Sequence, residues 1–193
     1  MGKTTACILL LPLVLTVLSS RAGAVEIHFY TNTRGCNGAG FTFTPAQVQV
    51  CYQYNAGSVM FLGMTSCRRS RVYGNSGCSG VSIGSSTGSV CYYGGGIKSA
   101  YWYYICRRRS LLSDNFTSSS DTTPICKSTV DKPTGIVYTE ESMTGSWMLK
   151  SPDAVNLMSQ LESLPAGEKI DWLKTQGATF VALSAVQTRE TNV

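Results

Sequence analysis

Six of the eight cysteines fall into two triplets with matching surroundings. The members are Cys36, Cys51 and Cys67 in the first triplet, and Cys78, Cys91 and Cys106 in the second. In each copy an apolar segment ends in tyrosine, a glycine turn surrounds the first cysteine, and arginines follow the last cysteine. The chain therefore contains one motif of about 40 residues written twice, and this duplication fixes the organisation of its first half.

Three further positions recur in both copies: an aromatic residue, a turn glycine and a serine that opens an aromatic run. They are Tyr30, Gly38 and Ser58 in the first copy and Tyr73, Gly80 and Ser99 in the second. Between these positions, short β-prone runs alternate with glycine, asparagine and proline turns. This pattern predicts a small all-β sandwich or barrel over residues 25–106.

Residues 1–24 have the composition of a secretory signal peptide. Lys3 gives a positive start, residues 6–18 are apolar but too few to span a bilayer, and residues 22–24 form a small-x-small cleavage pattern. We expect a secreted, extracellular protein that begins at Val25 and whose six matched cysteines form disulfides. A metal site is not expected, because the chain has no C-x-x-C pair and its only histidine is His28.

Charge divides the mature chain into two segments of opposite sign. Residues 25–109 carry a net charge of +7, whereas residues 110–193 carry −4. The candidate basic patch consists of Arg68, Arg69, Arg71, Arg107, Arg108 and Arg109, which follow equivalent cysteines. Such arginines, with exposed tyrosines beside them, favour an anionic membrane surface or a cell-wall polysaccharide as partner, and nucleic acid is not expected.

The second half of the chain has a different character. Residues 110–134 are rich in serine, threonine and aspartate and are predicted to form a linker, with an N-glycosylation sequon at Asn115. Residues 135–193 form an acidic segment that we expect to be mainly helical. Ser151 is a good N-cap for one helix, which ends at Pro165, and Gly177 is a good stop for a second helix over residues 166–176.

The sequence leaves two interpretations of the acidic segment open. It resembles a neutralising propeptide that is removed after the arginines at 107–109, in which case Cys126 leaves with it. Alternatively, it is an appendage packed against the β-rich half, with Cys126 either free or forming a dimer.

The repeated aromatic, glycine and serine positions resemble the βγ-crystallin Greek-key signature. The resemblance implies two four-stranded Greek keys packed as a sandwich, with a left-handed glycine in each folded hairpin and a serine hydroxyl that ties the hairpin down. The second copy, from Val72 to Cys106, is most similar to small secreted plant antimicrobial proteins of the macadamia type. The likeness covers residues 25–106 and does not extend to the acidic segment.

The resemblance also implies a disulfide pairing and a calcium position. The pairing that the resemblance implies is Cys36 with Cys91, Cys51 with Cys106 and Cys67 with Cys78. Six cysteines allow fifteen pairings, and the wide separation of Cys51 from Cys67 departs from the family pattern. The family's calcium positions correspond to residues 55–58 and 95–99. In the second of these segments Lys98 occupies a position where a hard cation needs an oxygen ligand, so calcium binding is disfavoured.

Catalysis requires at least two titratable groups that converge on one site. Residues 25–106 offer Glu26 and His28, which share one face of the first strand, and a solvated strand face is the favoured interpretation of this pair. We therefore expect a cationic antimicrobial or host-defence protein that is not an enzyme and needs no cofactor. The alternative is a structural or protein-binding βγ-crystallin module without toxicity.

Overall fold

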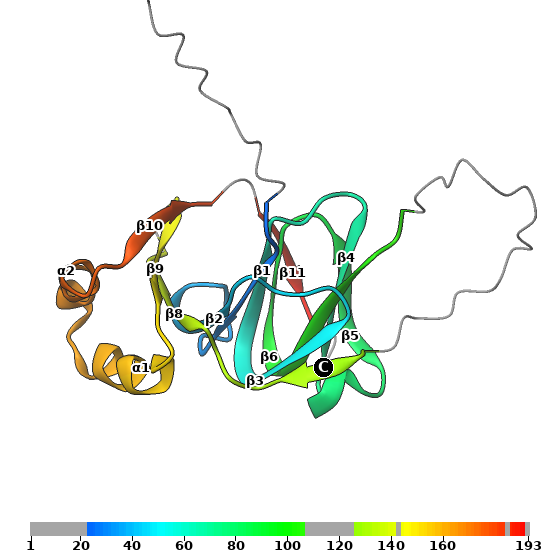
Figure 1. The fold of residues 1–193 in the computed structure, drawn as a ribbon, viewed down its shortest axis with the longest axis horizontal. Helices are drawn as coiled ribbons and strands as arrows, with labels where there is room; N and C mark the ends of the chain where they lie inside the picture. Colours follow the sequence, from blue (N-terminus) through cyan, green and yellow to red (C-terminus); the bar gives the residue numbers. More distant parts are fainter. Residues whose placement is uncertain (1–22, 107–125, 142–143, 184–185, 192–193) are drawn as a thin grey trace, which may run out of the picture.

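The computed structural model describes residues 23–106, 126–141, 144–183 and 186–191, and it is mostly β-sheet with a short helical part near the C-terminus (Figure 1). The β-rich half contains β1 (Glu26–Tyr30), β2 (Gly38–Phe43), β3 (Val50–Leu62), β4 (Arg68–Tyr73), β5 (Ser82–Thr87) and β6 (Val90–Tyr104), with a 3-10 turn at Ser76–Cys78. The expected all-β character of this half is confirmed. Arg107, Arg108, Arg109, Asn115 and residues 1–22 lie outside the described residues.

The two long strands, β3 and β6, each belong to two groups of strands. The second half of β3 pairs with β1 and with the start of β6, and β1 also pairs with β2. The second half of β6 pairs with β4 and with the start of β3, and β4 also pairs with β5. The two groups therefore have equivalent orders, β2-β1-β3-β6 and β5-β4-β6-β3. Register shifts between Gln53 and Ser58 mark the place where β3 passes from one group to the other.

The core of this half collects side chains from both groups. Successive side chains of a strand point to opposite faces, so Ile27 and Phe29 of β1 enter the main apolar cluster while His28 and Tyr30 face the other way. Val72 of β4 enters the same cluster from the second group. Each such fully buried side chain stabilises the fold by roughly 1.5–3 kcal/mol.

All six matched cysteines form disulfides, but two of the three pairs differ from those that the resemblance implied. Cys36 pairs with Cys91 as expected. The implied Cys51–Cys106 and Cys67–Cys78 pairs were wrong, because the bonds are Cys51–Cys78 and Cys67–Cys106. Strand pairing explains the Cys67–Cys106 bond. The start of β4 and the end of β6 lie together because Arg68 pairs with Tyr104, which places Cys67 beside Cys106.

The C-terminal half contributes strands as well as helices. These elements are β7 (Ser128–Val130), β8 (Gly135–Thr139), β9 (Gly145–Lys150), α1 (Ala154–Ser163), a 3-10 turn (Ala166–Glu168), α2 (Lys169–Thr175), β10 (Thr179–Ala182) and β11 (Gln187–Glu190). Both expected helices are present. The helical part is shorter than expected, because four strands (β8, β9, β10 and β11) accompany the helices in residues 135–193. β7 forms inside the expected linker.

Strand pairing joins the C-terminal half to the β-rich half. β8 pairs with β2, whereas β7 and β11 run parallel to β3 and β6. The helices lie at one end of the molecule and β4 and β5 at the other (Figure 1), and Leu161 and Leu173 from the helices pack with Phe41 of β2 and Ile136 of β8. This arrangement agrees with a packed appendage. Within the described ranges, no helix combines the length and apolarity needed to cross a lipid bilayer.

Candidate functional site

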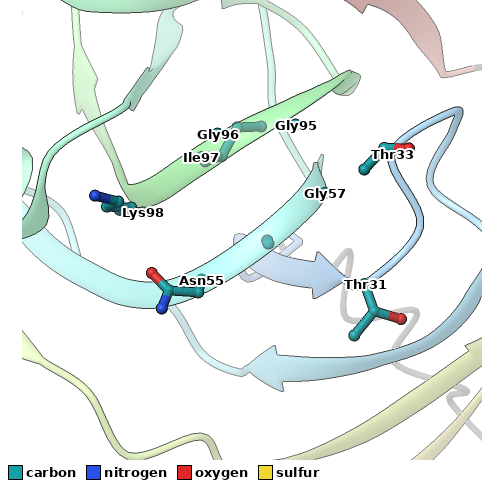
Figure 2. A pocket seen from close by; sticks show the side chains of 9 residues that line it. Thr31, Thr33, Asn55, Gly57, Gly95, Gly96, Ile97 and Lys98 are labelled. Atoms are coloured by element: carbon teal, nitrogen blue, oxygen red, sulfur yellow. The ribbon is translucent and has the colours of Figure 1, made fainter.

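Two hollows meet where β3 and β6 pass from one group of strands to the other. The first has a volume of about 370 Å³ and is lined by Thr31, Thr33, Asn55, Ala56, Gly57, Gly95, Gly96, Ile97 and Lys98. Figure 2 shows Asn55 and Lys98 at one end of this hollow and the two threonines at the other. The second, of about 390 Å³, is lined by Gln53, Tyr54, Asn55, Ser76, Lys98 and Asp131. We call the two together the seam groove.

The duplication of the sequence explains why there are two hollows. Thr31 and Thr33 of the first hollow follow β1, and Ser76 of the second follows β4, the equivalent strand of the second copy. Both hollows share the middle of β3 and of β6, where Asn55 and Lys98 lie. The seam groove therefore presents two related subsites in a row, joined at these two residues.

A run of three glycines forms part of the groove's wall. Gly94, Gly95 and Gly96 have φ angles of 122°, 88° and 68°, a backbone region that side-chain-bearing residues rarely adopt. Gly95 and Gly96 line the first hollow. Because they carry no side chain, a ligand can approach the backbone of β6 closely at this point.

The groove offers side chains that the rest of the described structure does not use. Asn55, Lys98, Thr31 and Thr33 are exposed, and no hydrogen bond within the described ranges engages their side chains. Its charged groups are one ammonium, from Lys98, and one carboxylate, from Asp131. A set of amides and hydroxyls around a single cation can hydrogen-bond a polyhydroxyl ligand, whereas the ammonium opposes a hard dication.

The predicted basic patch is divided where the structure describes it. Successive residues of β4 point to opposite faces, so Arg69 and Arg71 lie on one face and Arg68 on the other. The Arg68 guanidinium donates to the carbonyls of Gly63 (2.6 Å) and Gly23 (2.9 Å). Its carbon also lies 5.3 Å from the ring centre of Trp102. Arg68 therefore has a structural role, which the sequence pattern did not reveal.

The tyrosines near these arginines are mostly buried, so they do not form the exposed aromatic surface that would suit a polysaccharide or membrane partner. The rings of Tyr73, Tyr101 and Tyr103 stack in a row with centroid separations of 5.9 and 5.7 Å, and Arg71 lies 5.5 Å over Tyr103. None of the three is more than 6% exposed. Desolvation raises the pKa of Tyr101. Tyr104, by contrast, is 55% exposed.

The pair of Glu26 and His28 does not lie on a solvated strand face, so the favoured interpretation of the sequence was wrong. His28 is fully buried, with its Nε2 3.2 Å from the Glu26 carboxylate and its Nδ1 3.4 Å from the Tyr30 hydroxyl. That hydroxyl lies 3.2 Å from Thr139 Oγ1, which lies 2.6 Å from Ser146 Oγ. β8 and β9 supply the last two groups and cover this face of β1, which no local pattern could indicate.

The repeated motif residues take equivalent positions in the two copies. Gly38 and Gly80 have φ angles of 80° and 78°. The Ser58 hydroxyl donates to the Gly35 carbonyl at 2.7 Å. In the second copy the Ser99 hydroxyl donates to the Asn75 carbonyl at 2.5 Å and accepts the Cys78 N–H at 2.9 Å. These are contacts of the kind that the resemblance implies for the hairpin.

Comparisons with models of known protein families, with curated proteins and with solved structures found no match. The seam groove and the equivalence of the two copies are therefore the features that point to a function. Both are properties of the described residues themselves.

Proposed function

We propose that this chain is a secreted, disulfide-stabilised βγ-crystallin-like protein of the antimicrobial or host-defence kind, built from two Greek keys packed as a sandwich. The equivalent strand orders of the two groups support this assignment, because each group takes one half of a long strand from the other copy. The matched serine hydrogen bonds and left-handed glycines give further support. The protein acts by binding and not by catalysis.

The target is a cell-wall polysaccharide, held in the seam groove. The observation that carries this proposal is the pair of related hollows that share the unengaged side chains of Asn55 and Lys98. A polymer repeats its hydrogen-bonding groups along its length, as the groove repeats its subsites. Each hollow also has the volume typical of small-ligand sites. The ammonium of Lys98 favours a polymer that carries negative charge.

The geometry favours this target over an anionic membrane. Arg68 is committed to two backbone carbonyls, and Tyr101 and Tyr103 are buried. The described part of the basic patch therefore presents less free charge and aromatic surface than its sequence suggested.

The test is binding of the purified full chain to insoluble polymers: polygalacturonate as the acidic polymer, and a neutral β-glucan and an N-acetylglucosamine polymer. We expect the double variant Asn55→Ala/Lys98→Ala to bind its polymer at least about tenfold more weakly, because one neutral and one charged hydrogen bond are lost. Lys150→Ala is the matched control, since this exposed lysine of β9 lines neither hollow. Equal binding by the double variant and the wild type would contradict the proposal.

Two further measurements separate the candidate roles. The first is binding to vesicles of anionic phospholipid. If Asn55→Ala/Lys98→Ala still binds these vesicles and Arg69→Ala/Arg71→Ala does not, the functional surface is on β4. Binding through these arginines should weaken steeply with salt. Inhibition of microbial growth at concentrations that saturate polymer binding supports the defence role. Polymer binding without growth inhibition would instead favour a non-toxic binding module.

A further inference from the structure

Three cysteine sulfurs lie together at the start of β3. The Sγ atoms of Cys51, Cys78 and Cys126 all lie within 4.8 Å of one another. Cys51 and Cys78 form a disulfide, and Cys126 is a free thiol. A thiol next to a disulfide is the arrangement from which thiol–disulfide exchange proceeds, because the thiolate must reach one of the two bonded sulfurs.

The main chain holds Cys126 in this place. The N–H of Lys127, the next residue, donates to the carbonyl of Gln49 at 2.8 Å. Beyond it, β7 runs parallel to β3 with Thr129 beside Cys51. The main chain that follows Cys126 is therefore held against β3 by hydrogen bonds, which keeps the thiol near the disulfide.

We infer that these three cysteines form an exchangeable trio in which Cys126 replaces Cys78 as the partner of Cys51. The Cys126 thiol loses its proton to solvent, and the thiolate attacks Sγ of Cys51. The Cys51–Cys126 bond forms as the Cys51–Cys78 bond breaks, and Cys78 leaves as a thiolate that takes up a proton. One disulfide and one thiol are present before and after the step, so no oxidant or reductant is consumed.

Two observations identify Cys78 as the sulfur that leaves. Cys51 is fully buried, whereas Cys78 is partly exposed, so water stabilises a thiolate better at Cys78. Cys78 also has a φ of 51°, a left-handed conformation that costs a residue with a side chain roughly 1–2 kcal/mol. Opening the bond removes one restraint that keeps Cys78 in this conformation.

The exchange moves a covalent bond from within the β-rich half to the junction with the C-terminal half. Together with the Cys67–Cys106 disulfide, a Cys51–Cys126 bond anchors both ends of the segment between residues 106 and 126 to the β-rich half. A cut within that segment, such as cleavage after the arginines at 107–109, would then leave the C-terminal half covalently attached.

The exchange depends on pH in a defined way. Desolvation raises the pKa of Cys126 to about 11, so the thiolate is scarce at neutral pH. Below that pKa the thiolate fraction, and with it the rate of attack, rises about tenfold per pH unit.

The test follows the position of the free thiol in the full chain. The protein is incubated without reductant at pH 7 and at pH 9, the thiol is alkylated, and the labelled cysteine is identified by peptide mapping under non-reducing conditions. We expect the label to move from Cys126 to Cys78 with time, about 100-fold faster at pH 9. Cys126→Ser should give no label on Cys78. A label that stays on Cys126 at both pH values, or a Cys126 found only in a disulfide between two chains, would overturn the inference.

A second variant tests the reach of Cys126 independently. In Cys78→Ser, glutathione disulfide should close a Cys51–Cys126 bond while the Cys36–Cys91 and Cys67–Cys106 bonds stay intact. Continued alkylation of both Cys51 and Cys126 in the folded variant would contradict the proposed exchange, whatever the protein binds in the seam groove.

Discussion

At the scale of single residues, the strongest evidence for duplication is a pair of serine hydroxyls. Ser58 and Ser99 are both fully buried, and each donates to a carbonyl in the glycine turn of its own copy. The sequence indicated both residues by their spacing from the turn. Only the structure identifies Gly35 and Asn75 as the acceptors.

We predict that Ser99→Ala lowers the free energy of unfolding by about 1–3 kcal/mol. The substitution leaves the Asn75 carbonyl and the Cys78 N–H without their partner. Urea unfolding followed by fluorescence measures the effect. Ser79→Ala is the control, because this exposed hydroxyl bonds only to the nearby Ser76 carbonyl, and we expect a change within about 0.5 kcal/mol. Equal losses in the two variants would show that Ser99 does not tie the hairpin.

Buried tyrosines give the second prediction at this scale. Burial raises the pKa of both Tyr30 and Tyr92 from 10.0 to about 12. The unfolded chain therefore loses these protons near pH 10, whereas the folded chain keeps them until near pH 12. The contribution to stability is fully present below pH 10 and is lost as the pH rises through that window, by about 1.4 kcal/mol per pH unit for each tyrosine.

The measurement is the free energy of unfolding between pH 8 and pH 12, made in Cys126→Ser so that disulfide exchange does not interfere. Tyr30→Phe should reduce the slope above pH 10 by about 1.4 kcal/mol per pH unit, the share of one titrating tyrosine. A slope that Tyr30→Phe leaves unchanged would assign the alkaline loss of stability to other groups.

At the scale of elements, the helices were predictable and several strands were not. α1 and α2 have local signals, such as the serine at 151 and the stop at Gly177. The N-cap of α1 is Asp153 and not Ser151 as expected, although the Ser151 hydroxyl accepts the Asp153 N–H at 3.1 Å. β8 and β9 are short apolar runs, and periodicity alone does not distinguish such runs from buried helical segments. The assignment of β8 depends on pairing with β2, a strand almost 100 residues earlier in the chain, and β9 in turn pairs with β8.

Gly177→Ala is predicted to destabilise the protein by about 1 kcal/mol. Gly177 has a φ of 81°, its N–H donates to the Lys174 carbonyl, and the next N–H donates to the Leu173 carbonyl, which together end α2. An added Cβ meets no atom within 4 Å, so the cost is that of the backbone conformation alone. Gly167→Ala is the control, because an added Cβ there also meets no atom within 4 Å and Gly167 has no positive φ. Thermal unfolding should show no comparable loss of stability in this variant.

At the scale of the whole molecule, the C-terminal half is an integral part of the structure. Ile136 and Val137 of β8 are fully buried, and β8 and β9 supply the partners of Tyr30. Removal of the C-terminal half as a propeptide would leave one edge of β2 unpaired and would uncover Phe41. Cleavage of the chain and loss of the tail are therefore two separate events.

We predict that a single cut between residues 107 and 125 leaves the two fragments associated. A protease site placed in this segment, in the Cys126→Ser background, allows the cut without any covalent link across it. The fragments should co-elute in native size-exclusion chromatography and separate in denaturant, because the pairing of β8 with β2 and of β11 with β6 persists. Separation in native buffer would instead favour a releasable propeptide.

The sequence by itself determined what neighbouring residues specify: the duplicated motif, the β-rich character of residues 25–106, the left-handed glycines and the two helices. These features follow from turn chemistry, capping and alternation, which act over a few residues. Tertiary structure decided the partners of Cys51 and Cys67, the burial of His28 and the meeting of Asn55 with Lys98 in one groove. Each of these depends on which distant strands pair, and that choice is made by burial of the whole core.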